Sequence, residues 1–137
     1  MKQYIIKNGN INNDLIYNEF KKNNSIVGCF SHQCHYCLEM KPEWEKLKKR
    51  LRKVKTDCIF IEIEAEFLNK LAIDEISNKV NGFPSIMLFK NGKFYKTFQD
   101  KRTSKTMYDF LKPLLKLKKN KTKHTKKIKL NRTKRKY

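Results

Sequence analysis

Two cysteines and two histidines lie within six positions of one segment of the sequence, FSHQCHYCLEMKPEW at residues 30–44. Cys34 and Cys37 form a C-x-x-C pair, His35 lies between them, and His32 precedes them. Thiol and imidazole groups at this spacing bind zinc in some proteins and form a redox-active dithiol in others. The elements that hold the segment decide between these two chemistries.

An apolar run of strand length, Ser25–Phe30, comes before the C-x-x-C pair, and a helical pattern begins at about Cys34. Two cysteines three residues apart on a first helical turn lie within disulfide distance. Unpaired backbone N–H groups at a helix start stabilise a thiolate, and the thiolate is the attacking species. We therefore expect an exposed, nucleophilic Cys34 and a more buried Cys37 that resolves the mixed disulfide.

A structural zinc site is the competing interpretation of the same segment, and it needs a second pair of ligands. The other cysteines, Cys29 and Cys58, each lie within an apolar run and are interpreted as small buried residues. The side chains of residues 34, 35 and 37 do not all converge from one helical turn. We predict no metal and no bound cofactor, although an iron–sulfur cluster shared by two chains through Cys34 is a further alternative.

Two residues between the cysteines lie within the electric field of the sulfurs, and we predict that His35 and Tyr36 tune them. A protonated His35 would favour a nearby thiolate and make the disulfide more oxidising. His32 is interpreted as an ordinary loop histidine.

The rest of the chain predicts strands that alternate with helices, in the order β-α-β-α-β-α-β-β-α. Helix-separated strands are expected to pair in parallel, and the turn KNGK predicts a final antiparallel hairpin. The fold class is therefore α/β, a mixed central sheet flanked by helices. The expected strands are Gln3–Lys7, Ser25–Phe30, Cys58–Ile63, Ser85–Phe89 and Phe94–Phe98; the expected helices follow Asn12 or Asn13 and span about Cys34–Lys53, Glu66–Val80 and Ser104–Leu117.

Two prolines interrupt these helical patterns: Pro42 is expected to kink the second helix, and Pro113 to shorten or kink the last one. Thr103 or Ser104 is expected to cap that last helix. Four aromatic side chains are assigned to the core, namely Trp44, Phe89, Phe94 and Phe98.

The charge of the chain, +20 over 137 residues, is concentrated at its end. Residues 118–137 contain 11 Lys or Arg and no acidic residue, whereas residues 1–117 contain 22 basic and 13 acidic residues, a net +9. We therefore predict a domain at 1–117 and a Lys/Arg-rich tail at 118–137 that is disordered or loosely helical on its own. The tail is a candidate site for nucleic acid or another polyanion.

The N-terminal sequence MKQYIIKNGNINNDL lacks the apolar run of a secretory signal, and no stretch is apolar enough for a membrane span. The C-terminal sequence NRTKRKY is no retention signal. The expected location is intracellular, in the cytoplasm or nucleus, where structural disulfides are rare.

Several motifs besides the C-x-x-C pair, spread over roughly residues 3–117, match those of a known protein family. They are Pro42, five residues after the second cysteine, the segment GFPS at residues 82–85, the segment LFKNGK, and Arg102 with Thr103 before the last helix. Together they resemble the thioredoxin superfamily, most closely the redox-active domain of protein disulfide isomerases. The resemblance implies a thioredoxin fold and a thiol–disulfide oxidoreductase that needs no cofactor besides its own disulfide.

The resemblance also implies roles for matching residues. Pro84 would be a cis-proline that faces the disulfide, and the backbone of Phe83 would pair with an extended substrate. Arg102 would approach the buried cysteine and lower its pKa. The implied partners are proteins with disulfides or dithiols, and a reductase, glutathione or an oxidase that recycles the pair.

One position departs from this pattern: Gly28 lies six residues before Cys34, where the family places a buried Asp or Glu that accepts the proton of the second cysteine. Either turnover is then slower, or another group such as Glu62, Glu64 or water acts in its place. The departures at Gly28 and Gln33 favour an alternative function, a non-catalytic adaptor whose basic tail binds nucleic acid or another polyanion.

Overall fold

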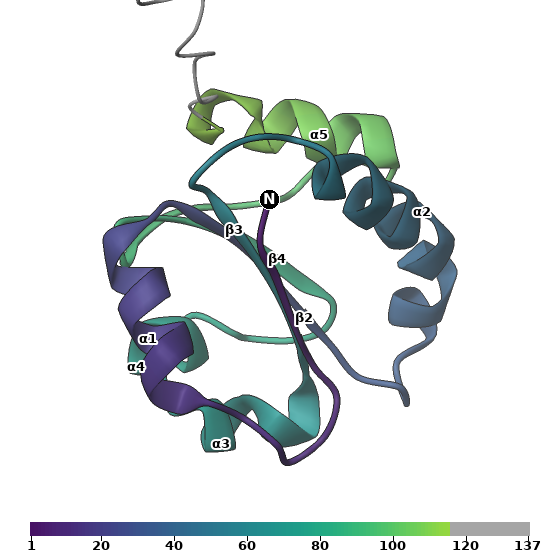
Figure 1. The fold of residues 1–137 in the computed structure, drawn as a ribbon. Coiled ribbons are helices and arrows are strands. Elements are labelled where there is room, and N and C mark those ends of the chain that lie inside the picture. The colour runs from purple at the N-terminus through teal and green to yellow at the C-terminus, as the bar shows by residue number, and fades with distance from the viewer. Residues whose placement is uncertain (116–137) are drawn as a thin grey trace, which may run out of the picture.

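Five strands form one sheet that lies between two layers of helices (Figure 1). The computed structural model of the protein describes residues 1–115, so the predicted tail and its boundary at residue 117 lie outside the described residues. The strands stand side by side in the order β1-β3-β2-β4-β5. Their bounds are β1 (Gln3–Ile6), β2 (Ser25–Phe30), β3 (Ile59–Glu64), β4 (Ser85–Lys90) and β5 (Lys93–Thr97).

The first three strands are parallel, because β1 and β2 each pair in parallel with β3. In contrast, β4 pairs antiparallel with β2, and β5 returns antiparallel to β4. The expectation of parallel pairing is therefore wrong for β4. The segment between β3 and β4 holds only two four-residue helices, each about 6 Å long. They are too short to carry the chain back along the sheet, so β4 starts at the end where β3 stops.

The helices follow the predicted order, and they are α1 (Asn13–Lys22), α2 (His35–Arg52), α3 (Leu68–Leu71), α4 (Asp74–Ser77) and α5 (Ser104–Leu111). The side chain of Asn12 caps α1 and that of Thr103 caps α5. Helix α2 continues without interruption through Pro42. Pro113 lies in a 3₁₀ turn, Lys112–Leu114, that shortens the last predicted helix. None of the helices described within residues 1–115 combines the length and apolarity needed to cross a membrane.

The predicted helix Glu66–Val80 is wrong as one unit, because it consists of a 3₁₀ turn at Ala65–Phe67 followed by α3 and α4. Ala72 has a left-handed backbone (φ 56°) and separates the two short helices. Leu71 and Ile73, on either side of it, are both buried. In one continuous helix these two side chains would point about 200° apart. The break at Ala72 lets both of them face the sheet.

Each face of the sheet has its own apolar core. Helices α1, α3 and α4 cover one face, while α2 and α5 cover the other (Figure 1). Strand β3 has the sequence IFIEIE, and its three isoleucines point toward α1. By alternation, Phe60, Glu62 and Glu64 point toward α2. Two carboxylates are therefore placed beneath the helix that carries the C-x-x-C pair.

The predicted aromatic core is confirmed at Trp44 and Phe89, which are buried, and at Phe98, which packs against the core on the α2 side. It is wrong at Phe94, which is 38% exposed. Phe94 lies on β5, an edge strand whose residues are all exposed, and Lys79 Nζ lies 4.6 Å from the centre of its ring.

Trp44 lies directly against β2 at the point where that strand has no side chain. A Cβ atom built on Gly28 would lie 2.5 Å from two carbons of the indole ring. Heavy atoms do not approach so closely, so position 28 accepts only glycine while Trp44 stays in place. The indole therefore fills the space that a side chain from position 28 would need.

A Gly28→Ala substitution is expected to lower the free energy of unfolding by about 1–3 kcal/mol, because an extra methyl group overpacks the core. Chemical denaturation of the variant and the wild type measures this change. Gly82→Ala is the matched control, since nothing lies within 4 Å of a Cβ atom at Gly82, and its stability should change by no more than about 0.5 kcal/mol. Equal stability of the two variants would contradict this account of position 28.

Candidate functional site

The C-x-x-C pair lies where β2 ends and α2 begins. Cys34 has an extended backbone and is the N-cap residue of α2, and its Sγ accepts a hydrogen bond from the Cys37 backbone N–H at 3.3 Å. The first N–H groups of a helix have no partner within the helix. The sulfur of Cys34 therefore takes the place of a capping oxygen and faces the positive end of the helix dipole.

Cys34 is partly exposed, and its surroundings lower the pKa of its thiol. A hydrogen bond with the Cys37 side chain is the main cause. The backbone N–H groups of Cys37 and Tyr36 and the charge of Arg102 act in the same direction, against the opposing effect of burial. Cys34 is therefore the cysteine that forms a thiolate at the lower pH.

Cys37 is 5% exposed, and burial is the main cause that raises the pKa of its thiol to about 11. The neighbouring Cys34 raises it further, whereas Arg102 and a hydrogen bond from the Ser31 backbone N–H, 3.5 Å from Sγ, oppose the shift. The two sulfurs thus share one helical turn but hold their protons very differently. This difference matches the expected division between an attacking and a resolving cysteine.

The loop before β4 faces the first cysteine. The Phe83–Pro84 peptide bond is cis. In its thiol form Cys34 donates a hydrogen bond from Sγ to the backbone carbonyl of Phe83 at 3.3 Å. The residues singled out from the GFPS segment therefore lie beside the sulfur, although Phe83 is 49 positions away from Cys34 in the sequence.

The three residues expected to tune the cysteines take different positions. Arg102 lies over the ring of Tyr36, with 5.6 Å between its guanidinium carbon and the ring centre, and its charge lowers the pKa of both cysteines. His35 is exposed and points toward Glu39, one helical turn further along, with 3.4 Å between Nε2 and the carboxylate. A tuning role for His35 and Tyr36 stays a prediction.

A groove of about 630 Å³ opens beside Cys34. Tyr36 and Met40 of α2, Pro84 before β4, and Lys101 and Arg102 before α5 line it. The groove is wide enough for side chains of a polypeptide, and its wall carries both signs of charge, because Glu39 and Asp100 line it as well.

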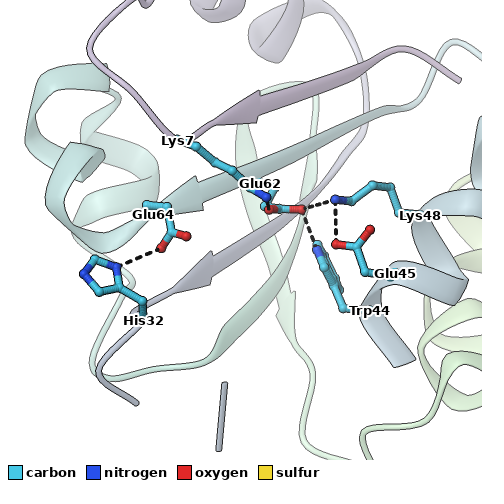
Figure 2. Close-up of polar contacts among 7 residues, drawn as sticks. All are labelled: Lys7, His32, Trp44, Glu45, Lys48, Glu62 and Glu64. Atoms are coloured by element: carbon cyan, nitrogen blue, oxygen red, sulfur yellow. Dashed lines mark hydrogen bonds and ion pairs between the residues drawn. The ribbon is translucent and has the colours of Figure 1, made fainter. Parts of the chain in front are cut away.

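A cluster of charged side chains lies between β3 and α2 (Figure 2). Glu62 is buried, and its Oε1 accepts a hydrogen bond from Trp44 Nε1 at 2.8 Å. The same oxygen lies 2.8 Å from Nζ of the buried Lys48, and Oε2 lies 3.6 Å from Lys7 Nζ. Lys48 also pairs with Glu45 at 2.8 Å. Burial lowers the pKa of Lys48, but its hydrogen bonds with the two carboxylates outweigh this effect and raise the pKa.

The sequence indicates Glu62 and Glu64 as candidates, but it does not indicate Lys48 or the contact of Trp44 with Gly28. The interpretation of His32 as an ordinary loop histidine leaves out its partner, because His32 Nδ1 lies 3.8 Å from Glu64. The signal for the carboxylates was present, because two glutamates two positions apart in an apolar strand must share one face. The position of His32 had no such signal, since it depends on how the loop folds.

The remaining cysteines behave as expected for buried apolar residues. Cys29 and Cys58 are buried, and burial raises the pKa of each thiol to about 12. All four cysteines are free in this structure. Within residues 1–115, no three His, Cys, Asp or Glu side chains are arranged to hold a metal ion.

The sheet order, the flanking helices and the position of the cysteine pair define a thioredoxin fold. A family model described as thioredoxin matches residues 5–113. The chain therefore belongs to the thioredoxin family. No curated protein matches the sequence with significance.

Solved structures with the same fold include single-domain and multidomain proteins. A mutant thioredoxin from Halobacterium salinarum is 16% identical, with a TM-score of 0.59 over 86% of this chain and 95% of that chain. The first two thioredoxin domains of Naumovozyma dairenensis Eps1p are 25% identical, with a TM-score of 0.60 over 74% of this chain and 40% of that chain. The zinc-bound form of human ERp44 is 14% identical, with a TM-score of 0.60 over 82% of this chain. This chain spans only 31% of ERp44.

Alkylation should separate the two cysteines by pH. Iodoacetamide is expected to modify Cys34 first, with a rate that rises as the thiolate forms and reaches half of its maximum below pH 9.0, the ordinary thiol value. Cys37 should react only as the pH approaches about 11. Mass spectrometry of the modified peptides gives both profiles. The Cys34→Ser variant is the control that must lose the first phase, and a midpoint at or above pH 9.0 for Cys34 would contradict the lowered pKa.

Proposed function

We propose that the protein is a thiol–disulfide oxidoreductase that reduces, forms or isomerises protein disulfides with Cys34 and Cys37. The observation that carries this proposal is the geometry of the pair: the sulfur of the partly exposed Cys34 lies at the start of α2, 3.3 Å from the Cys37 backbone N–H and 3.3 Å from the carbonyl of Phe83 before the cis-proline, whereas Cys37 is buried on the same helical turn. The lowered pKa of Cys34 and the raised pKa of Cys37 agree with this division. Membership of the thioredoxin family supports it. In such a dithiol, one sulfur attacks the substrate and the other stays protonated until the mixed disulfide has formed.

The reducing direction proceeds in two exchanges. The Cys34 thiolate attacks one sulfur of a substrate disulfide, and the other substrate sulfur leaves as a thiolate. Cys37 then loses its proton and attacks Cys34, so that the remaining bond to the substrate breaks. The substrate gains two electrons and two protons and becomes a dithiol, while the two cysteines become a disulfide. The oxidising direction reverses these steps.

The substrate is expected to bind along the loop before β4. A protein segment with a cysteine would lie extended beside the backbone of Phe83 and Pro84, which places its sulfur next to Cys34. The groove lined by Tyr36 and Arg102 lies beside this position and would receive neighbouring side chains of the substrate.

The reduction potential of the pair decides the direction in which the protein works. A value near about −270 mV would make it a reductant that a reductase or glutathione recycles, whereas a value of about −180 mV or above would indicate an isomerase or an oxidant. Equilibration with glutathione buffers measures it. Binding of nucleic acid or another polyanion by residues 118–137 stays a separate prediction.

The insulin assay tests the proposed activity. With dithiothreitol as the source of electrons, the wild type is expected to accelerate the turbidity that reduced insulin produces. Cys34→Ser should abolish the acceleration, because the attacking sulfur is lost. Cys58→Ala is the matched control, since Cys58 is a buried thiol in the core on the α2 side, and it should retain activity. Full activity of Cys34→Ser would exclude the proposed mechanism.

A further inference from the structure

The second exchange requires a proton acceptor for Cys37, because the thiol has a pKa of about 11 and is buried. The usual acid of the family is absent at Gly28, and the indole of Trp44 fills the space beside that position. The acceptor must therefore come from another element. This inference rests on the proposed function, because it concerns the step in which Cys37 attacks.

A small crevice of about 60 Å³ connects Cys37 with the charged residues behind it. Cys37 and Trp44 of α2, His32 of the preceding loop, and Glu62 and Glu64 of β3 all line it. This volume accommodates at least one water molecule, and its walls offer the polar partners that such a water needs. A water here would link the thiol to either carboxylate.

Glu62 is poorly suited to accept a proton. Its Oε1 already accepts a hydrogen bond from Trp44 and lies 2.8 Å from the ammonium group of Lys48, and its Oε2 faces Lys7 (Figure 2). Both carboxylate oxygens of Glu62 therefore already have polar partners. Protonation of Glu62 would also leave the buried Lys48 with a weaker counter-charge. Its position indicates a structural role.

Glu64 differs from Glu62 in the hydrogen bonding of its carboxylate. Its Oε2 is buried and, within residues 1–115, has no hydrogen-bond partner. A buried carboxylate oxygen normally has one, so this atom has acceptor capacity to spare. Glu64 pairs with Phe30 in the sheet register, two positions nearer the C-x-x-C end of the strands than Glu62, which pairs with Gly28.

His32 connects Glu64 with the solvent. Its Nδ1 lies 3.8 Å from Glu64 Oε2, the same oxygen that lacks a hydrogen bond, and 65% of the His32 side chain is exposed (Figure 2). An imidazole ring can accept a proton at one nitrogen and release one from the other. A proton that reaches Glu64 therefore has a short route out of the protein.

We propose that Glu64 accepts the proton of Cys37 through water in the crevice, and that His32 passes this proton to the solvent. As the S–H bond of Cys37 breaks, its sulfur forms a bond with the sulfur of Cys34. The bond between Cys34 and the substrate then breaks, and the departing substrate thiolate takes a proton from the solvent. No further oxidant or reductant is involved, because the two cysteines supply both electrons.

The test separates the two exchanges in time. Reduced protein is mixed with one equivalent of a chromogenic aryl disulfide, whose thiolate absorbs visible light. Attack by Cys34 releases the first aryl thiolate, and attack by Cys37 on the mixed disulfide releases the second. In Glu64→Gln the first phase should be unchanged, which also shows that the variant is folded. The second phase should slow by about a hundredfold, the lower range for removal of a general base.

The pH dependence distinguishes proton transfer from a merely structural effect. The difference in second-phase rate between Glu64→Gln and the wild type should shrink as the pH rises toward about 11, because the Cys37 thiol then ionises without a proton acceptor. The other charged groups around the crevice are Lys7, Lys41, Glu45 and Glu62. They are unchanged in this variant and contribute equally to both profiles.

Two further variants sharpen the test. Glu66→Gln is the matched control. Glu66 Oε1 also lies near His32, 4.0 Å from Nδ1, but the Glu66 side chain is 58% exposed. The second phase of this variant should match that of the wild type. In His32→Gln the second phase should become slower in dilute buffer and should recover when free imidazole is added.

Each outcome has a distinct meaning. A second phase of wild-type rate in Glu64→Gln, or an equal slowing in Glu66→Gln, overturns the role of Glu64. A second phase of His32→Gln that ignores imidazole removes His32 from the route and overturns that part of the proposal. A wild type that shows no first phase overturns the proposed function itself.

Discussion

The packing of Trp44 against β2 is the contact on which the rest of the site depends. The indole lies on a strand that has only a hydrogen atom at Gly28, and this close approach fixes the distance between α2 and the sheet. The same ring donates the hydrogen bond that orients Glu62, which in turn neutralises the buried Lys48 of α2. A helix held through two residues of its inner face, Trp44 and Lys48, then presents its first turn, with both cysteines, at a defined position beside the loop before β4.

That first turn gives its two sulfurs opposite properties. Cys34 is at the surface, receives backbone hydrogen bonds and faces Arg102, whereas Cys37 points inward, where burial dominates. The start of one helix therefore holds both a thiol with a lowered pKa and a thiol with a raised pKa. The carboxylates of β3 line the crevice beside Cys37, whereas Pro84 lines the groove beside Tyr36, so the two hollows lie against different residues of the same helical turn.

Local patterns predict most of this architecture. The apolar run before Cys34 and the helical spacing after it are sufficient to place the pair at a strand–helix junction, and the motif around Pro84 indicates the facing loop. Features that depend on distant parts of the chain are not predictable in this way. The direction of β4 follows from how short α3 and α4 are, and the break at Ala72 follows from the need to bury both neighbours.

The same limit explains the errors at single side chains. Phe94 has an apolar pattern typical of a core residue, but its exposure follows from the edge position of β5, which only the strand order reveals. His32 gains a partner because β3 lies next to β2, so that Glu64 ends beside Phe30 and the loop that follows it. Neither the exposure of Phe94 nor the partner of His32 can be predicted from the neighbouring residues in the sequence.

The contact between Trp44 and Gly28 also has an evolutionary consequence. An acidic side chain at position 28 has no room while the Trp44 ring keeps its present place, because both need the same space. Replacement of the tryptophan by a smaller residue would free only part of that space, because Phe30 Cε2 also lies 2.8 Å from a Cβ atom at position 28, and it would remove the hydrogen bond that orients Glu62. A lineage that exchanges one arrangement for the other by single substitutions must therefore pass through a less stable protein. Such epistasis would tend to preserve whichever arrangement arose first.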